Sequence, residues 1–232
     1  MAELLEASRT VQQDDSLGAL VVAANGPVWS SGGDPNALQS GFGPGADASY
    51  LVHREKIGGE NGLGDLSDQA IEFDALGIGA WLTAYLQCEK PLIAAIDGVA
   101  VGGGFALALA HDVRVISDRA RFMPAFNGLG VGPELGASWT LARLVNPSRA
   151  ASIIMTNTWV DADEALASGL ANLTVTSADL LATAVDYGAR ISARPLPQVL
   201  AAVRALREAA GTTLEQRLAL EWDARRASAG PA

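Results

Sequence analysis

The segment PLIAAIDGVAVGGGFALALAHDVRVIS, residues 91–117, limits the possible folds more than any other part of the chain. It places the short apolar runs LIAAID and DVRVIS on either side of a glycine turn and the apolar run FALALAH. Short apolar runs bounded by glycine are typical of buried strands, and the run after the triple glycine is typical of a helix. Asp97 and four glycines interrupt the most hydrophobic part, which argues against a membrane-spanning helix. Strands that alternate with helices predict an α/β fold.

The same periodicities predict the remaining elements. Helices are expected over residues 2–13, 67–88, 134–144, 147–156, 161–168, 178–192 and 197–227, the last broken near Gly211, and strands over 18–24, 120–122 and 171–175. Residues 36–64 are rich in Gly, Ser, Asp and Asn, and we expect a long functional loop that is mobile without ligand. Because the end of the chain is almost wholly helical, the sequence predicts an α/β core over 1–176 and a C-terminal helical region over 177–232.

Composition narrows the class of function. Apolar residues make up 49% of the chain and charged residues only 18%, with a net charge of −10. An acidic chain does not suit nucleic acid or an anionic membrane surface, and the low charge content favours self-association. One cysteine and two histidines, with no metal-binding pattern around them, predict no disulfide within the chain and no metal site. We expect a cytoplasmic enzyme or small-molecule binder.

Two glycine turns and one glutamate are the candidate functional features. The turns are SSGGD at 30–34 and GGG at 102–104. Backbone N–H groups at the start of a helix favour negative charge and can stabilise an oxyanion, although such glycines also allow a helix to pack closely on a sheet. Glu134 follows Pro133 in GLGVGPELGASWTL, and the residues alone allow either an ordinary helix-start charge or a proton-transfer group. His111 ends an apolar helix, and we expect it to be stabilised there by the helix dipole.

Three separated stretches, VVAANGPVWSSGGD, KPLIAAIDGVAVGGGFALALAHDVRVISDRARF and ADEALASGLANLTV, together resemble the crotonase superfamily of enoyl-CoA hydratases and isomerases. The resemblance runs in order from Leu17 to Val175. It implies a crotonase-like spiral of ββα units followed by a C-terminal helical region, assembled as a homotrimer or homohexamer. It implies an acyl-CoA thioester as substrate, with coenzyme A as part of that substrate and no separate cofactor. This chain begins at a helix, so the resemblance also implies that the family's first two strands are missing.

The resemblance assigns roles to the first glycine turn and the triple glycine. Gly33 and Gly103 match the positions whose backbone N–H groups form the family's oxyanion hole. Ser31, Gly32 and Asp34 are the implied contacts to coenzyme A. These roles fit the chemistry of a thioester, because its enolate gathers charge on one oxygen that fixed N–H dipoles stabilise.

The departures from the family pattern indicate which reaction to expect. Ala106 and Phe126 stand where enoyl-CoA hydratases carry their two glutamates, and with Leu129 they are expected to line the substrate pocket. Neither side chain activates water. Glu134 matches the catalytic glutamate of Δ3,Δ2-enoyl-CoA isomerases, so the resemblance implies isomerisation of a 3-enoyl-CoA to a 2-enoyl-CoA by one base. A specialised hydratase, a hydrolase, a decarboxylase and a non-catalytic acyl-CoA-binding subunit are the alternatives.

Overall fold

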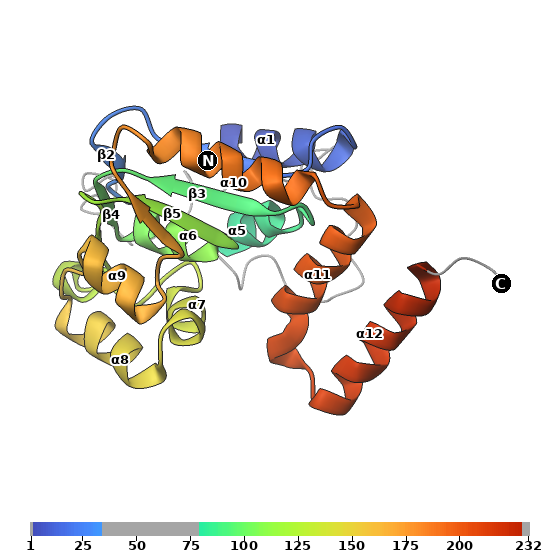
Figure 1. Cartoon of the computed structure of the whole chain (residues 1–232). Helices are drawn as coiled ribbons and strands as arrows, with labels where there is room; N and C mark the ends of the chain where they lie inside the picture. The colour runs from blue at the N-terminus through green and yellow to red at the C-terminus, as the bar shows by residue number, and fades with distance from the viewer. Residues whose placement is uncertain (1, 34–78, 229–232) are drawn as a thin grey trace.

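The structure is a computed structural model that describes residues 2–33 and 79–228. The predicted loop at 36–64, Asp34 and the first part of the predicted helix at 67–88 lie outside the described residues. In the described part, two parallel sheets form the centre and helices surround them (Figure 1). The predicted α/β fold is therefore confirmed.

The strands divide between two sheets in a regular way. The first sheet has the order β1 (Leu20–Ala23), β3 (Leu92–Ile96), β5 (Val113–Ser117) and β7 (Leu173–Val175), and the second has the order β2 (Val28–Ser30), β4 (Val99–Val101) and β6 (Arg121–Met123). Consecutive strands enter different sheets, and all neighbours are parallel. One helix follows the pair β3 and β4, and further helices follow the pair β5 and β6. The chain therefore forms the expected spiral of ββα units.

The helices largely follow the sequence predictions. They are α1 (Ala2–Gln13), α5 (Gly79–Leu86), α6 (Gly103–Ala110), the 3-10 turn η1 (Asn127–Leu129), α7 (Ala137–Leu144), α8 (Pro147–Thr156), α9 (Ala162–Ser168), α10 (Leu180–Ser192), α11 (Leu196–Glu208), the 3-10 turn η2 (Ala209–Gly211) and α12 (Leu214–Ser228). The predicted break near Gly211 is confirmed, because η2 separates α11 from α12. The division of the chain at residue 176 stays a prediction.

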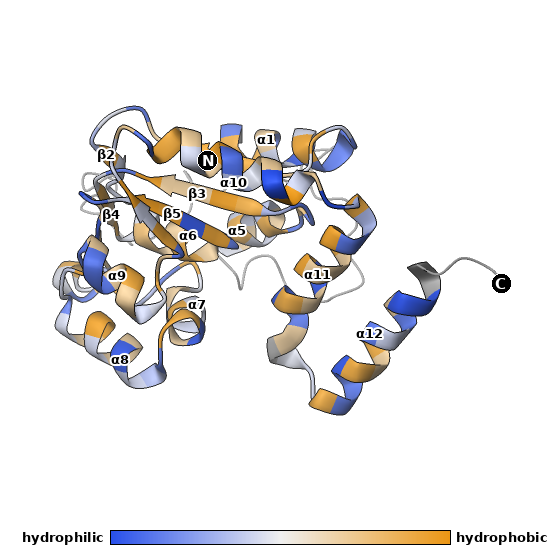
Figure 2. Cartoon of the chain, in the orientation of Figure 1, coloured by the Kyte–Doolittle hydropathy of each residue, from blue (hydrophilic) through white to orange (hydrophobic). Residues whose placement is uncertain are grey.

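The central strand β3 is buried on both faces. Leu92, Ala94 and Ile96 pack on the side of α5 and α6, whereas Ile93 and Ala95 pack under α10. Side chains alternate between the two faces of a strand, so a strand covered on both sides needs a continuous apolar run. Figure 2 shows β3 as mostly hydrophobic along its length. The run LIAAI therefore places β3 at the centre of the fold and α6 directly beside it.

The predicted helix at 134–144 begins later than expected. Leu135 has a φ of 49° and Gly136 a φ of 69°, and α7 starts at Ala137. Two consecutive residues in the left-handed region cannot continue into a right-handed helix, and Gly136 adopts that conformation without strain. The prediction that Glu134 lies in the first turn of this helix is therefore wrong. Glu134 lies in the tight turn before it.

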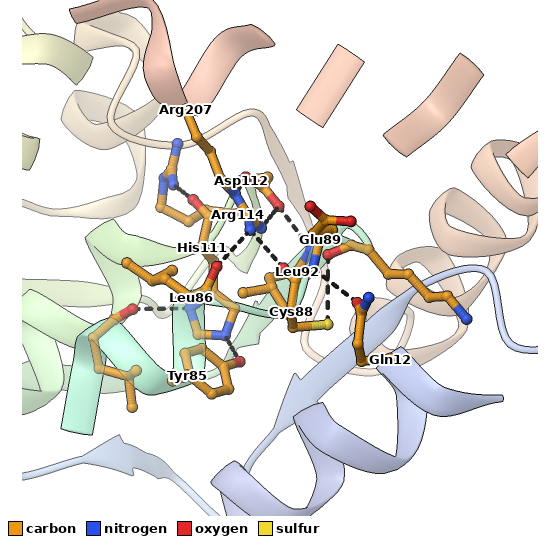
Figure 3. Close-up of polar contacts among 12 residues, drawn as sticks. Gln12, Tyr85, Leu86, Cys88, Glu89, Leu92, His111, Asp112, Arg114 and Arg207 are labelled. Atoms are coloured by element: carbon orange, nitrogen blue, oxygen red, sulfur yellow. Dashed lines mark hydrogen bonds and ion pairs between the residues drawn. The ribbon is translucent and has the colours of Figure 1, made fainter. Parts of the chain in front are cut away.

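The last two helices extend from the core and are anchored by one arginine. The Arg207 side chain of α11 pairs with Asp112 through Nε and Oδ1 at 2.9 Å and through Nη2 and Oδ2 at 2.6 Å (Figure 3). Its Nη1 also donates to the carbonyl oxygens of Leu86 and Cys88, at the end of α5. Asp112 Oδ2 accepts a further bond from the Leu92 N–H. Charged, forked hydrogen bonds of this kind fix α11 on α5 and β3.

Within the described ranges, no helix combines the length and the apolar character needed to cross a membrane.

Candidate active site

The two glycine turns meet at the start of α6. Gly32 has a φ of 88°, and a Cβ atom there would lie 2.7 Å from the Val101 carbonyl oxygen and 3.1 Å from the Gly103 nitrogen. A Cβ atom on Gly104 would lie 2.5 Å from the Ser30 Oγ. Neither position has room for a side chain, so glycine at both allows the turn after β2 to approach α6 this closely. The sequence showed two separate turns, and the fold brings them together.

Two unused N–H donors lie beside each other at this junction. The Gly33 nitrogen is 4.0 Å from the place where a Cβ atom on Gly103 would stand. Within the described residues, the N–H groups of Gly33 and Gly103 donate to no backbone or side-chain acceptor. Gly103 is also the first residue of α6, where the helix dipole adds partial positive charge. This arrangement is suited to binding one ligand oxygen that carries negative charge.

The turn that holds Glu134 borders the same junction. Its neighbour Leu135 places Cδ1 3.6 Å from the position of a Cβ on Gly103. Glu134 is half-buried, and its backbone carbonyl accepts a 3.0 Å bond from the Ala137 N–H. Its carboxylate forms no hydrogen bond or ion pair with the described part of the chain. A carboxylate without a partner among the described residues, in a turn whose next residue lies near Gly103, is a candidate proton acceptor.

Backbone strain is concentrated around this turn. Ala125 and Leu135 have φ values of 61° and 49°, and both flank the segment that carries Phe126 and Glu134. For a residue with a side chain, each such conformation costs about 1–3 kcal/mol and persists only where the surroundings impose it. Strain of this kind gathers at functional sites, which supports assigning function to the segment from 125 to 135. This strain could not be predicted from the sequence, because neither alanine nor leucine favours the left-handed region.

The three predicted pocket residues lie in different surroundings. Ala106 is fully buried and Phe126 is 3% exposed, and both belong to one hydrophobic core with Phe105 and Phe122. Leu129, in η1, is 59% exposed and lies outside that core. The structure thus brings Ala106 and Phe126 together and leaves Leu129 on the surface.

The predicted coenzyme A contacts fall on the turn after β2. Ser31 is exposed and Gly32 is partly buried, and the Gly32 N–H donates to the Ser30 Oγ at 3.3 Å. Asp34 lies outside the described residues. Ser31 is therefore open to a ligand beside the two N–H groups.

A buried histidine closes the other end of α6. His111 is 2% exposed, with its Nδ1 2.8 Å from the Leu107 carbonyl oxygen and its Nε2 3.0 Å from the Tyr85 hydroxyl (Figure 3). A neutral ring satisfies both contacts if Nδ1–H donates to Leu107 and Nε2 accepts from Tyr85. Burial, together with the nearby positive charge of Arg114, lowers the pKa of His111 to about 4. The prediction of a dipole-stabilised, charged histidine is therefore wrong, because desolvation outweighs the helix end.

The buried histidine predicts an acid-sensitive fold. The pKa of His111 is about 4 in the folded chain, whereas the ordinary pKa of a histidine is 6.5. Between these two values the unfolded chain therefore binds more protons than the folded chain. The stability that the neutral His111 contributes is complete above pH 6.5 and is lost as the pH falls toward 4. The loss amounts to about 3 kcal/mol. Between pH 7.5 and 4.5, the free energy of unfolding measured in urea should fall more steeply for the native chain than for His111→Gln. Equal slopes would contradict the prediction.

Comparison with known proteins identifies the family. The family model described as enoyl-CoA hydratase/isomerase matches residues 69–228. The chain belongs to this family, which is the crotonase superfamily. Among curated relatives, 4-chlorobenzoyl coenzyme A dehalogenase-1 of Arthrobacter sp. is 31% identical over 93% of this chain and 70% of its own length. The crotonyl-CoA hydratase of Syntrophomonas wolfei is 29% identical over 97% of this chain and 77% of its own length.

Solved crotonase structures have the same fold. An enoyl-CoA hydratase from Polaromonas sp. JS666 superposes with a TM-score of 0.80 at 26% identity, covering 98% of this chain and 80% of that one. A Thermobifida fusca YX protein in complex with acetoacetyl-CoA superposes with a TM-score of 0.74 at 27% identity, covering 98% of this chain and 83% of that one. The sequence-based assignment to the crotonase superfamily is thereby confirmed.

Proposed function

We propose that this crotonase shifts the double bond of an enoyl-CoA from the 3 to the 2 position, with Glu134 as the single base. The observation that carries the proposal is the placement of Glu134. It lies in a strained turn whose next residue, Leu135, reaches the space beside Gly103, and its carboxylate has no partner among the described residues. A first-turn helix charge would have explained the residue without catalysis. That explanation fails because α7 begins at Ala137.

In the proposed reaction, the thioester oxygen accepts hydrogen bonds from the N–H groups of Gly33 and Gly103. The Glu134 carboxylate removes a proton from C2 of the 3-enoyl group, and the electron pair moves into the thioester to form a dienolate. The same carboxyl group then returns the proton at C4, which leaves the double bond between C2 and C3. No water is consumed and no group is transferred. Stabilisation of the dienolate oxygen by two fixed donors supplies several kcal/mol.

Simple hydration by the family's two-glutamate arrangement is disfavoured by the residues at those positions. Ala106 and Phe126 are buried, apolar and part of one core. They cannot orient or deprotonate a water molecule. A specialised hydratase, a hydrolase and a decarboxylase are the alternatives to test. Relatives named as hydratases and as a dehalogenase show that the family includes reactions other than isomerisation. A non-catalytic acyl-CoA-binding subunit is a further alternative.

The substrate class is supported by solved relatives. Two Thermobifida fusca YX structures contain CoA and acetoacetyl-CoA. We extend this to the present chain, with Ser31 and Gly32 as contacts to coenzyme A and Ala106 and Phe126 as part of the pocket wall. Leu129 would contact the substrate only at the surface. A cytoplasmic location is part of the same proposal.

One panel of assays tests the proposed function. The purified protein is incubated with a 3-enoyl-CoA, crotonyl-CoA, malonyl-CoA and 4-chlorobenzoyl-CoA, and the products are separated by chromatography. We expect turnover of the 3-enoyl-CoA to the 2-enoyl-CoA. If the protein converts only one of the other thioesters, the proposed function changes from isomerisation to that reaction. Tight binding without turnover of any would favour the non-catalytic subunit.

The C-terminal helices are proposed to bury an apolar stripe against other copies of the chain in a homotrimer or homohexamer. Leu214, Leu218 and Trp222 recur at helical spacing on α12 and are exposed, with Trp222 at 58%. Figure 2 shows hydrophobic and hydrophilic residues alternating along this helix, which extends from the core. An exposed stripe of large apolar side chains marks an interaction surface.

Light scattering tests this assembly. At micromolar concentration, we expect a mass that is three or six times that of the chain, because the stripe is buried only in the oligomer. Leu218→Glu should shift the mass toward the monomer, because an apolar interface offers no partner for the buried carboxylate. Met155→Glu changes an exposed apolar residue on α8, outside this stripe, and should leave the mass unchanged. A monodisperse monomer of the native chain would exclude the assembly.

A further inference from the structure

The side chain of Leu135 lies close to the two N–H donors. Its Cδ1 lies 3.6 Å from the position of a Cβ on Gly103, and that position is in turn 4.0 Å from the Gly33 nitrogen. In the structure, Leu135 is the large apolar side chain in contact with the space beside Gly103.

The position of Leu135 is imposed by its surroundings. It packs against two hydrophobic cores, the one that contains Ala106 and Phe126 and the one formed by α1 and α5. Its φ of 49° is unfavourable for leucine. A strained backbone that holds an apolar side chain between two cores leaves that side chain little freedom to move away.

We infer that Leu135 determines substrate specificity by limiting the size of the substituent on C2 of the bound acyl group. The inference rests on the proposed function, which places the thioester oxygen between Gly33 and Gly103. C2 is then only two bonds from that oxygen and must lie close to the same glycines. In a straight chain, C2 carries only hydrogens in addition to C1 and C3. A methyl branch on C2 needs the volume that the Leu135 side chain fills. The geometry points to unbranched acyl-CoA thioesters as preferred ligands.

Binding of two saturated thioesters tests this without requiring turnover. Affinities for butanoyl-CoA and 2-methylbutanoyl-CoA are measured by titration calorimetry for the native chain and for Leu135→Ala. We expect the native chain to prefer butanoyl-CoA by about tenfold or more, the size of effect that one methyl group produces in a fitted pocket. Leu135→Ala should abolish most of that preference, mainly by binding the branched thioester more tightly.

Matched variants separate this effect from a general loosening of the core. Leu144→Ala removes the same atoms from a leucine of α7 that packs on the same core, and Leu144 is not among the three nearest neighbours of the Cβ position on Gly103. It should keep the native preference. Leu135→Met conserves the volume and should keep it too. If Leu135→Ala does not fold, Leu135→Gly makes the same test, because glycine tolerates the positive φ.

The outcomes distinguish the inference from the proposed function. An unchanged preference in Leu135→Ala, an equal shift in Leu144→Ala, or a native chain that binds both thioesters equally would each overturn the inference. A shift confined to Leu135, in a protein that does not isomerise 3-enoyl-CoA, would support the role of Leu135 and exclude the proposed reaction.

Discussion

Replacing Glu134 with glutamine should lower the rate of 3-enoyl-CoA isomerisation about 100-fold or more. The amide keeps the shape and most of the hydrogen-bonding capacity of the carboxylate but cannot take up the proton from C2. The affinity for acyl-CoA should change little, because in the proposed reaction the N–H groups of Gly33 and Gly103 hold the thioester oxygen. Turnover and binding are measured in parallel on the native chain and on Glu134→Gln.

The structure makes this experiment decisive between two roles. A glutamate that only contributes to a turn can be replaced by glutamine with a change in stability of about 0.5 kcal/mol or less. Glu3→Gln removes the same charge from the exposed face of α1 and serves as the control. Isomerisation at the native rate by Glu134→Gln would assign the residue to the turn and remove it from the mechanism.

Much of the fold was predictable because its central elements are long enough to show their pattern. The runs LIAAI and VRVIS predicted β3 and β5, and the helix predicted over 147–156 has the bounds of α8, which begins at Pro147 after a capping Asn146. The strands β2 and β4 were missed. Each is three residues long, too short for a period of two to be recognised, and each runs directly into a glycine turn.

The candidate site was predicted in its parts but not in its arrangement. Glycine content indicated two turns, whereas their approach depends on the space left by hydrogen at Gly32 and Gly104, which only the packed structure reveals. The start of α7 was placed too early because Pro133 and Glu134 are typical of a helix start, and Gly136 overrides them. His111 was judged by the helix end, while its protonation is set by burial.

Replacing Gly103 with proline should abolish most of the turnover while the fold is retained. Gly103 is the first residue of α6, a position where the N–H has no partner in the helix and where proline is well accommodated. Its Cβ would meet only ordinary contacts of 3.6 Å or more. The substitution thus removes one of the two proposed donors to the thioester oxygen, and loss of one such donor lowers the rate by roughly 100-fold to 1000-fold.

Two further variants serve as controls for this result. Gly103→Ala adds the same Cβ but keeps the N–H, so its turnover should exceed that of Gly103→Pro. Gly104→Ala places a Cβ 2.5 Å from Ser30 and should destabilise the fold instead. Thermal unfolding and turnover, measured on all three, separate the loss of a donor from the loss of packing. A folded Gly103→Pro protein with native activity would show that the Gly103 N–H does not bind the reacting oxygen, because proline has no hydrogen to donate there.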